Sequence, residues 1–541
     1  MTPLRPAALC AALAAALAVT SCSGSADPAS PEAAAAPEIT TSVPGPTSGV
    51  DSVTWNLPAG EPPSLDPAMS SSDSASTVVA TLCEGLFSFG PDYTLEPALA
   101  TGYEQPDPLT YVISLREDAA FWNGDPVTAQ DVVASVERLL DPSVGAAWIG
   151  WAARLDGLEA TGDHEVTITL TEPDVLVANY FATPAFNVVQ ASYAEEAGDG
   201  FGTARDGVMC TGPYRFESWE QGREITVTRN DDWWNTDAEV RVERLRFTFV
   251  TDPYAQAAAL TSGDADGQFN VPRAAHAQLA EQGSMLYGRS LAPTFLAVVD
   301  QEGPLSDIAT RRAIQALIDY DGIVESVYQG AAEPLRALVP PAAWGYAEDD
   351  YREAYEALPA PAYDPDLALG LLSESGTAEE TVVLAYATFV EEETRIATSL
   401  ADNAAEVGLH IELMPLTAEQ FGAVFSSPEA REGVDLLLST GYLDFPEPLT
   451  YYQYFSTGSF YNFAGYSDEE YDRYISTATA AEDPAERARE VIGAQAIMAE
   501  DLITIPIASQ YVNAYHDADL TGLVPRQNYL YTPWATGLGG R

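Results

Sequence analysis

The chain has 541 residues and a formal net charge of −57, with 46% hydrophobic and 10% aromatic residues. Such a length exceeds one ordinary core, so we expect two or more lobes, and the apolar content excludes a disordered acidic chain. An acidic surface without a basic patch repels nucleic acid, which is therefore excluded as a partner. Two interpretations of the charge stay open, a preference for cationic ligands and solubility in a salty or extracellular setting.

The N-terminus combines a short apolar segment with a cysteine. Arg5 precedes apolar residues 7–19, which are too few to span a bilayer as a mature helix. The segment ends in Val19-Thr20-Ser21-Cys22, and small residues before a cysteine are typical of a bacterial lipobox. We therefore predict a lipoprotein signal peptide over residues 1–21 and lipidation of Cys22. An ordinary secreted protein with an incidental cysteine is the alternative.

Residues 22–50 are predicted to be a flexible tether. They are mostly Ala, Pro, Ser, Thr and Gly, which bury too little surface to order a segment. Each buried acyl methylene contributes roughly 0.8 kcal/mol, so several acyl chains on Cys22 make a permanent anchor. The folded body is then expected on the outer face of the cytoplasmic membrane.

The first half of the chain reads as short strands and one capped helix. Residues 53–57 and 164–170 are predicted strands, as are residues 109–116. Asn123-Gly124 predicts a tight turn, and Thr128 is a helix cap. The helix that follows has an apolar stripe on one face, formed by Val132, Val133, Val136, Leu139 and Leu140.

A hairpin is predicted after residue 208. Gly212-Pro213 interrupts the sequence Val-Met-Cys-Thr-Gly-Pro-Tyr-Arg-Phe-Glu-Ser-Trp, because Gly tolerates unusual backbone angles and Pro fixes φ. Alternating apolar residues then follow on both sides of a turn at residues 221–223. The segment closes with Asn-Asp-Asp-Trp-Trp at residues 230–234.

The second half of the chain predicts an α/β lobe. A strand at residues 294–300 precedes a helix over residues 311–319, and Ser306 and Asp307 are its candidate caps. Strands at residues 382–386 and 409–413 flank a helix that ends at Gly408, which is a β-α-β unit with a right-handed crossover. Residues 434–438 are apolar apart from Asp435, as in a strand buried on both faces.

This last strand leads into Gly441-Tyr442-Leu443-Asp444-Phe445-Pro446-Glu447-Pro448. In open α/β sheets ligands bind beyond the carboxyl ends of strands, so this loop is the leading candidate for ligand contact. Seven aromatic residues follow, and they either line a pocket or pack the loop against its own lobe: Tyr451, Tyr452, Tyr454, Phe455, Phe460, Tyr461 and Phe463.

Several ordered blocks resemble the extracytoplasmic solute-binding proteins of peptide and nickel ABC importers, the oligopeptide- and dipeptide-binding family. The blocks are Pro-Pro-Ser-Leu-Asp-Pro-Ala at residues 62–68, residues 109–133, the Thr-Gly-Pro-Tyr hairpin, the helix at residues 311–319, and Ile-Thr-Ile-Pro-Ile at residues 503–507. The resemblance covers nearly everything from about residue 53 to residue 541.

The resemblance implies an α/β fold of the type II periplasmic-binding-protein kind, with two lobes joined by hinges and a small domain inserted in the first. It gives the following organisation after the signal peptide (1–21) and tether (22–50): lobe I, first part (51–93); inserted domain II (94–207); lobe I, second part (208–296); lobe II (297–504); and a return to lobe I (505–541).

In peptide-binding members of the family, the loop Trp-x-x-Asp-(Tyr/Phe)-x-(Asp/Glu)-Pro pairs its Asp with the α-ammonium of the peptide. The resemblance assigns that role to Asp444, with Gly441, Tyr442, Leu443 and Phe445 as further ligand-binding residues. A turn-stabilising role for Asp444 is the alternative. A desolvated carboxylate needs a cationic partner, so the ammonium role is chemically sensible.

The loop departs from the family at two places. Gly441 replaces the family's Trp, with Tyr442 as the residue expected to fill its space. Dipeptide binders also carry an Arg for the ligand carboxylate, whereas residues 387–393 contain no Arg and the next is Arg395. The ligand is therefore expected to be longer than a dipeptide, to lack a carboxylate, or not to be a peptide.

Two cysteines remain after Cys10 is removed with the signal and Cys22 is lipidated. In the family the segments around Cys83 and Cys210 belong to the same lobe, which implies a Cys83–Cys210 disulfide in an oxidising compartment. Two small buried apolar residues are the alternative.

The function implied is that of a monomeric receptor that captures a solute, foremost an oligopeptide, and presents it to ABC importer permease subunits. No cofactor or metal is expected. Other ligands (a metal chelate, an oligosaccharide, a cationic small molecule) and a transport-independent sensor stay open. A secreted hydrolase is the remote alternative, because the sequence has four His and no His-Glu-x-x-His, Gly-x-Ser-x-Gly or Cys-x-x-Cys motif.

Overall fold

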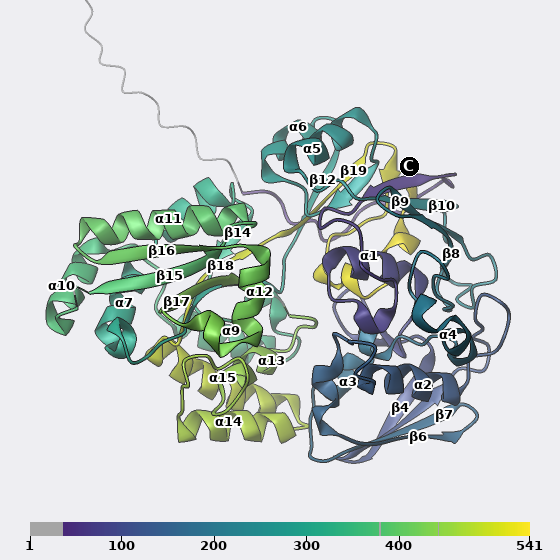
Figure 1. The fold of residues 1–541 in the computed structure, drawn as a ribbon, viewed down its shortest axis with the longest axis horizontal. Coiled ribbons are helices and arrows are strands. Elements are labelled where there is room, and N and C mark those ends of the chain that lie inside the picture. The colour runs from purple at the N-terminus through teal and green to yellow at the C-terminus, as the bar shows by residue number, and fades with distance from the viewer. Residues whose placement is uncertain (1–35, 378–379, 442) are drawn as a thin grey trace, which may run out of the picture. The chain divides into compact units, whose positions relative to one another are not determined.

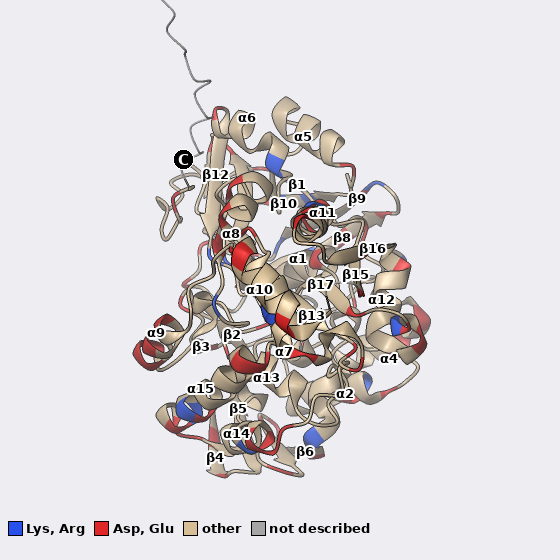
Figure 2. Ribbon diagram, turned by 90° about the vertical axis from the view of Figure 1, so that its left-hand side faces the viewer, with Lys and Arg blue, Asp and Glu red and all other residues tan. Residues whose placement is uncertain are grey.

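The computed structural model describes residues 36–377, 380–441 and 443–541, and residues 36–541 form one compact unit. The predicted signal peptide and Cys22 lie outside the described residues. Among the helices of the described part, none combines the length and the apolar character that a membrane crossing requires. Figure 2 shows acidic residues on helices and loops throughout this unit, with basic residues far fewer.

The first lobe is built on a seven-stranded sheet (Figure 1), in which β1 pairs in parallel with β10 and β11 and the other pairs are antiparallel. In spatial order its strands are β12 (Gly283–Gly288), β19 (Val512–Asp517), β11 (Gly267–Phe269), β1 (Val53–Asn56), β10 (Arg244–Thr248), β9 (Glu224–Arg229) and β8 (Tyr214–Glu220). The predicted hairpin is confirmed as β8 and β9.

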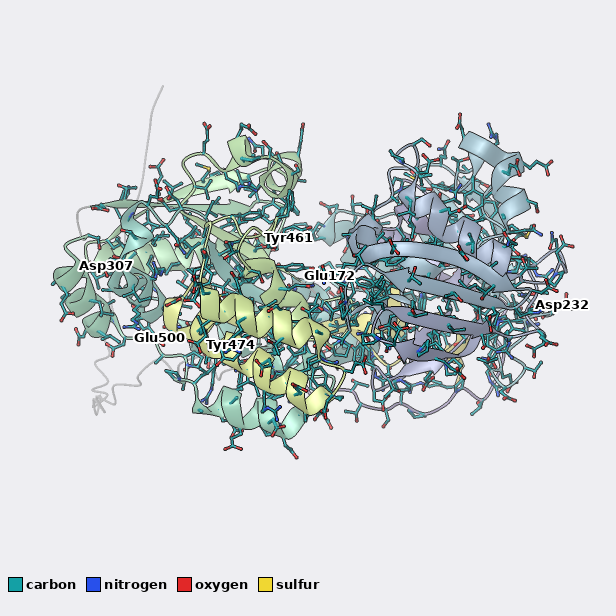
Figure 3. All side chains as sticks on the ribbon, turned by 90° about the horizontal axis from the view of Figure 1, so that it is seen from below. Glu172, Asp232, Asp307, Tyr461, Tyr474 and Glu500 are labelled. Carbon is teal, nitrogen blue, oxygen red and sulfur yellow. A yellow bond between two sulfur atoms is a disulfide. The ribbon has the colours of Figure 1, made fainter. Side chains whose placement is uncertain are left out.

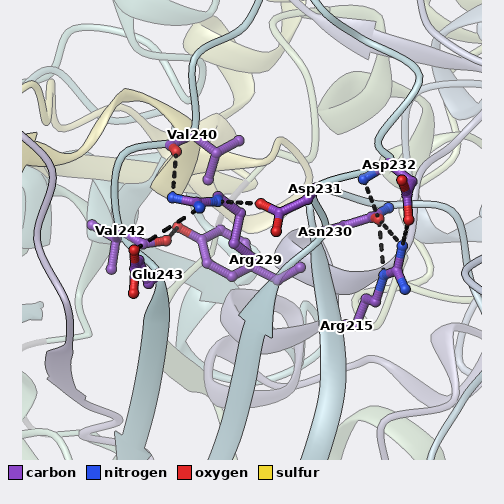
Figure 4. Close-up of polar contacts among 9 residues, drawn as sticks. Arg215, Arg229, Asn230, Asp231, Asp232, Val240, Val242 and Glu243 are labelled. Carbon is purple, nitrogen blue, oxygen red and sulfur yellow. Dashed lines mark hydrogen bonds and ion pairs between the residues drawn. The ribbon is translucent and has the colours of Figure 1, made fainter.

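The closing segment of the hairpin is fixed by two arginines (Figure 4). Arg215 donates to the Asn230 side chain and to Asp232, the latter at 2.8 Å. Arg229 donates to Asp231 at 2.7 Å. The strands therefore hold the segment that ends in Trp233 and Trp234 through side-chain bonds as well as through the sheet.

A four-stranded antiparallel sheet forms the inserted region, with the order β4 (Ala100–Asp107), β5 (Thr110–Leu115), β7 (Glu165–Leu170) and β6 (Leu155–Gly162). Helix α2 (Ala129–Leu140) begins at the predicted cap, where Thr128 and Asp131 bond reciprocally to each other's backbone N–H. Val132, Val136 and Leu139 of α2 are buried in the same core as the sheet. The predicted turn and cap are confirmed, and the apolar stripe is confirmed except at Leu140, which is exposed.

The second lobe contains a six-stranded sheet, with the order β14 (Ala332–Pro334), β18 (Thr504–Gln510), β13 (Pro293–Val298), β17 (Leu436–Thr440), β15 (Thr381–Ala387) and β16 (His410–Leu416). Strands β15 and β16 are parallel and joined by α11 (Glu391–Glu406), which confirms the β-α-β unit. Strand β17 lies between β13 and β15, and Leu436, Leu437 and Leu438 are buried as predicted.

The remaining helices cover these sheets and the C-terminal part of the second lobe. They are α1 (Asp73–Leu82), α3 (Val177–Tyr180), α4 (Ala191–Ala197), α5 (Pro253–Ser262), α6 (His276–Ala280), α7 (Ile308–Ala316), α8 (Tyr320–Gly322), α9 (Glu348–Ala357), α10 (Pro365–Ser375), α12 (Ala418–Ser426), α13 (Leu449–Tyr452), α14 (Glu469–Ala480) and α15 (Pro484–Asp501). Short strand pairs are β2 (Phe87–Phe89) with β3 (Leu95–Pro97), and β20 (Leu520–Thr521) with β21 (Gly539–Gly540).

The predicted boundaries between lobe I and lobe II, 296/297 and 504/505, do not coincide with the places where the chain passes from one large sheet to the other. Strand β13 already pairs with β17 from Thr294 onward, and β18 pairs with β13 and β14 up to Gln510. Ile505 and Ile507 are fully buried in the second lobe, which is why the predicted return strand stays there. The crossings are residues 289–292 and Tyr511, and Ser509 ties them by donating to the Ala292 carbonyl at 3.2 Å.

The predicted tether does not extend to residue 50. The Thr40 N–H donates to the Tyr287 carbonyl at 2.7 Å, and the Val50 N–H donates to the Arg241 carbonyl at 2.8 Å. Val43 and Val50 pack against the first-lobe core, which gives this segment apolar anchors that its overall composition conceals. The body therefore begins about ten residues earlier than predicted.

Cys83 and Cys210 are joined by a disulfide, with their Cα atoms 5.0 Å apart. Beside it, the buried Glu84 carboxylate accepts hydrogen bonds from the Thr211 hydroxyl and from the indole N–H groups of Trp233 and Trp234, at 2.8, 3.2 and 2.9 Å respectively. Burial raises the pKa of Glu84, and these three donors oppose the shift. The C-terminal end of α1 therefore contacts both ends of residues 208–234, here called the hairpin block.

Candidate functional site

The candidate loop, residues 441–448, begins where β17 ends. Strand β17 runs parallel to β15 and antiparallel to β13, so its carboxyl end emerges beside the carboxyl ends of β15 and β16. The segments that follow these three strands therefore share one edge of the sheet. That edge is the usual place for ligands in open α/β sheets.

A buried carboxylate fixes the strand ends at this edge. Glu393, on the first turn of α11, accepts the Ala387 N–H at 3.0 Å and the Thr440 N–H at 3.1 Å, and so joins the ends of β15 and β17. Burial raises the pKa of Glu393 to about 7, and the charge of Glu392 adds to the shift. Sequence reasoning missed this role, although an acidic residue on the first turn of a helix that follows a strand is a usable signal.

The far end of the loop is fixed by a buried ion pair. Glu447 is almost fully buried and lies 3.3 Å from Arg487, and the Tyr346 hydroxyl donates to Glu447 at 2.7 Å. The Arg487 guanidinium also stacks on the Tyr346 ring at 4.3 Å. Burial raises the pKa of Glu447 and the charge of Arg487 opposes the shift. The backbone between Gly441 and Glu447 is thus held at both ends.

Asp444 lies between these two anchors and contacts another part of the unit. The Tyr531 hydroxyl, from the C-terminal segment, donates to its carboxylate. Tyr531 packs edge-on against Trp148 of the inserted region, with ring centroids 5.5 Å apart. Desolvation raises the pKa of Asp444 to about 6, and the Tyr531 hydrogen bond opposes the shift. The site therefore presents a partly desolvated carboxylate where three regions of the chain meet.

The other predicted loop residues have different environments. Leu443 and Phe445 are almost fully buried, and Phe445 packs on Tyr180 with ring centroids 5.3 Å apart. Their side chains therefore support the loop from within. A Cβ atom on Gly441 would lie 1.8 Å from the Tyr451 hydroxyl oxygen, so Tyr451 occupies the space beside Gly441. Tyr442 itself lies outside the described residues.

Among the described residues, Arg154 and Arg395 are already engaged by other groups of the chain. Arg154 of the inserted region is paired with Glu172 and with Asp174, each at 3.1 Å. Arg395, the first Arg after the β15 loop, donates instead to the Ser326 carbonyl at 2.7 Å. Neither arginine is a free partner for a ligand carboxylate. The described residues contain no group of three or more His, Cys, Asp or Glu arranged to hold a metal ion.

Comparison with protein families identifies the chain. The model of the bacterial extracellular solute-binding proteins, family 5 Middle, matches residues 94–463. The chain belongs to this family. The resemblance inferred from its sequence blocks is thereby confirmed, and members of the family are binding proteins.

Two similar proteins are the dipeptide-binding protein DppE of Bacillus subtilis and the glutathione-binding protein GsiB of Escherichia coli K12. DppE is 25% identical over 501 residues, covering 88% of this chain and 90% of DppE. GsiB is 25% identical over 470 residues, covering 85% of this chain and 89% of GsiB.

Solved structures confirm the two-lobe type II fold. The ABC transporter substrate-binding protein CtaP of Listeria monocytogenes has a TM-score of 0.78 at 18% identity, covering 91% of this chain and 100% of CtaP. The murein tripeptide binding protein MppA of Escherichia coli has a TM-score of 0.73 at 21% identity, covering 91% of this chain and 98% of MppA. At these identities the likeness concerns the fold.

Proposed function

We propose that this protein captures an amine-bearing solute, foremost an oligopeptide, between its lobes and delivers it to the permease of an ABC importer. The observation that carries the proposal is the Asp444 carboxylate, held at the carboxyl end of β17 in contact with Tyr531 of the C-terminal segment. The names of relatives support the peptide class, since DppE is a dipeptide-binding protein and MppA a murein tripeptide binding protein.

A cationic partner suits the chemistry of Asp444. A partly desolvated carboxylate is stabilised by an ammonium group, through a charge-assisted hydrogen bond that is stronger than a neutral one. The alternative of a turn-stabilising Asp is weakened, because an Asx turn uses the N–H two residues on and that residue is Pro446. The adjacent Glu447 N–H is already bonded to the Phe445 carbonyl at 2.9 Å.

Capture requires that the lobes open and close. The crossings at residues 289–292 and Tyr511 are two adjacent connections between the large sheets, and short connections of this kind absorb the dihedral changes of hinge closure. A ligand that binds the closed form better shifts the population toward it, and a permease can distinguish closed from empty receptors.

We also propose that Cys22 carries lipid and that the body is a monomer held at the outer face of the cytoplasmic membrane. The apolar segment ahead of Cys22 and its small flanking residues support the anchor. Mass measurement of the N-terminal peptide from the native host tests it. An acylated Cys22 is expected, and a mature terminus elsewhere would contradict the proposal.

Native mass spectrometry of the full chain purified from its host tests the ligand class. The expected result is a ladder of adducts that dissociate into peptides on activation. All 24 basic residues of the chain are Arg, so an amine-specific reagent marks ligand amines with little background from the protein. A single discrete non-peptide mass would contradict the peptide class, and favour a metal chelate, an oligosaccharide or a cationic small molecule.

A further inference from the structure

Beside Asp444, the second lobe carries a continuous set of aromatic side chains, here called the aromatic band. Its members follow three neighbouring strands at the ligand edge of the sheet. Phe389 follows β15, α12 follows β16 and carries two of the rings, and the others follow β17. The band consists of Phe389, Phe421, Phe425, Phe463, Tyr461, Phe460, Tyr454 and Tyr451.

The outer half of the band is connected ring to ring. Phe389 meets Phe421 with centroids 5.8 Å apart, Phe421 meets Phe425 at 5.3 Å, and Phe425 meets Phe463 at 5.9 Å. Tyr461 then continues the series at 6.4 Å from Phe463. Separations and tilts of this kind are the preferred geometries of aromatic pairs.

The inner half of the band leads to the candidate loop. Tyr461 meets Tyr454 at 4.9 Å, and Tyr454 meets Tyr451 at 6.0 Å. The Tyr451 hydroxyl lies where a Cβ on Gly441 would be. Tyr180 of the inserted region packs on Phe445, the residue next to Asp444, with ring centroids 5.3 Å apart.

Core packing accounts for part of the band and leaves the rest unexplained. Phe421, Phe425 and Phe463 pack against a small core on one face of the sheet. Phe389, Phe460 and Tyr461, however, keep 57%, 63% and 42% of their surface exposed. Figure 3 shows Tyr461 at the border of the second lobe on the side of Glu172, a residue of the inserted region. Large contiguous apolar surface in water is a mark of a binding site.

We propose that the aromatic band is an extended subsite that binds aromatic or other large apolar side chains of a peptide whose terminal amine pairs with Asp444. This rests on the proposed function and specifies its ligand, an amine-terminated peptide rich in apolar residues. The band lies at the same sheet edge as Asp444 and reaches its loop, so one extended chain can contact both. Stacking on exposed rings removes apolar surface of both partners from water, whereas a short polar peptide leaves the outer rings wet.

Calorimetric titration of the full chain with two tetrapeptides, tetra-alanine and Ala-Phe-Leu-Phe, tests the subsite. We expect the aromatic peptide to bind at least about tenfold more tightly, because burying large apolar side chains contributes that much or more. The double variant Phe460→Ser/Tyr461→Ser should lose most of this preference while it still binds tetra-alanine like the parent.

The matched control is Tyr254→Ser, which removes an aromatic side chain that is 83% exposed on α5 in the first lobe. It should keep the full preference. Equal affinity of the parent for the two peptides, or an unchanged preference in the double variant, would overturn the subsite and leave the proposed function standing. Failure of both peptides to bind would overturn the subsite and the proposed function together. Circular dichroism of each variant verifies that its fold is retained.

Discussion

The hairpin block of the first lobe (residues 208–234 with Glu84) and the loop after β17 each hold a carboxylate away from water, almost fully in the first and partly in the second. In the first, Glu84 receives three donors from its own chain and lies beside a disulfide. In the second, Asp444 accepts a hydrogen bond from Tyr531 of the C-terminal segment, and the aromatic band reaches the loop at Gly441 through Tyr451. The hairpin block, which carries the most recognisable motif, therefore stabilises the fold. The candidate site lies instead in the loop at residues 441–448, whose sequence departs from the family pattern.

Loss of the Cys83–Cys210 disulfide should give the largest effect in this comparison. The bond closes a loop of 127 residues, so Cys83→Ala/Cys210→Ala is expected to lower the free energy of unfolding by about 4–5 kcal/mol in the chain-entropy account. Chemical denaturation with and without a thiol reductant measures it. The reductant should destabilise the parent and leave the variant unchanged, and a parent insensitive to reductant would contradict the assignment.

Replacement of the structural carboxylate should come next in size. Glu84→Ala leaves the Thr211 hydroxyl and two indole N–H groups without their acceptor, and each orphaned buried donor costs about 1–3 kcal/mol, so a loss of roughly 3 kcal/mol or more is expected. Glu117→Ala, on an exposed residue of the inserted region, is the control and should be nearly neutral. If both substitutions changed the denaturation midpoint by the same small amount, the structural role of Glu84 would be contradicted.

The carboxylate of Asp444, the proposed ligand contact, should make both stability and binding depend on pH. Its pKa of about 6 is raised above the ordinary value, so the unliganded protein loses stability as pH rises from about 4 to 6. The affinity for an amine should instead increase as pH rises, because the amine pairs with the ionised carboxylate. Affinity should be constant above pH 6 and fall about tenfold per pH unit below it.

Titration calorimetry between pH 5 and pH 8 measures this profile, with Asp444→Asn as the control. The variant should bind weakly at every pH. Any pH dependence that persists in it would report another group, of which Glu393 is the leading one because its pKa is about 7. A parent whose affinity does not change from pH 8 to pH 5 would contradict the role of Asp444.

The sequence predicted the parts of this structure that depend on local pattern. The β-α-β unit, the Thr128 cap and the hairpin follow from spacing and turn chemistry, and the disulfide partners followed from the family resemblance. The end of the tether was missed because two valines anchor an otherwise polar segment. The crossings were misplaced because a strand motif does not reveal which sheet it joins.

For the candidate site, the sequence predicted the location of the loop but not the contacts around it. The end of β17 and the carboxylate at residue 444 could be read from the sequence, but their environment could not. Tyr531 lies 87 residues from Asp444, and Glu393 joins two strand ends across 47 residues. Pairings at such separations are set by the tertiary fold, and no local pattern encodes them.

The most direct test of the account compares tetra-alanine with its N-acetylated form at pH 8, by titration calorimetry of the parent and of Asp444→Asn. Removing either the peptide ammonium or the Asp444 charge leaves the other without its partner and should weaken binding at least about tenfold. We therefore predict that acetylation has this effect on the parent and almost none on the variant. Equal binding of the two peptides by the parent would contradict capture through the amine, as would a variant that still discriminates fully between them.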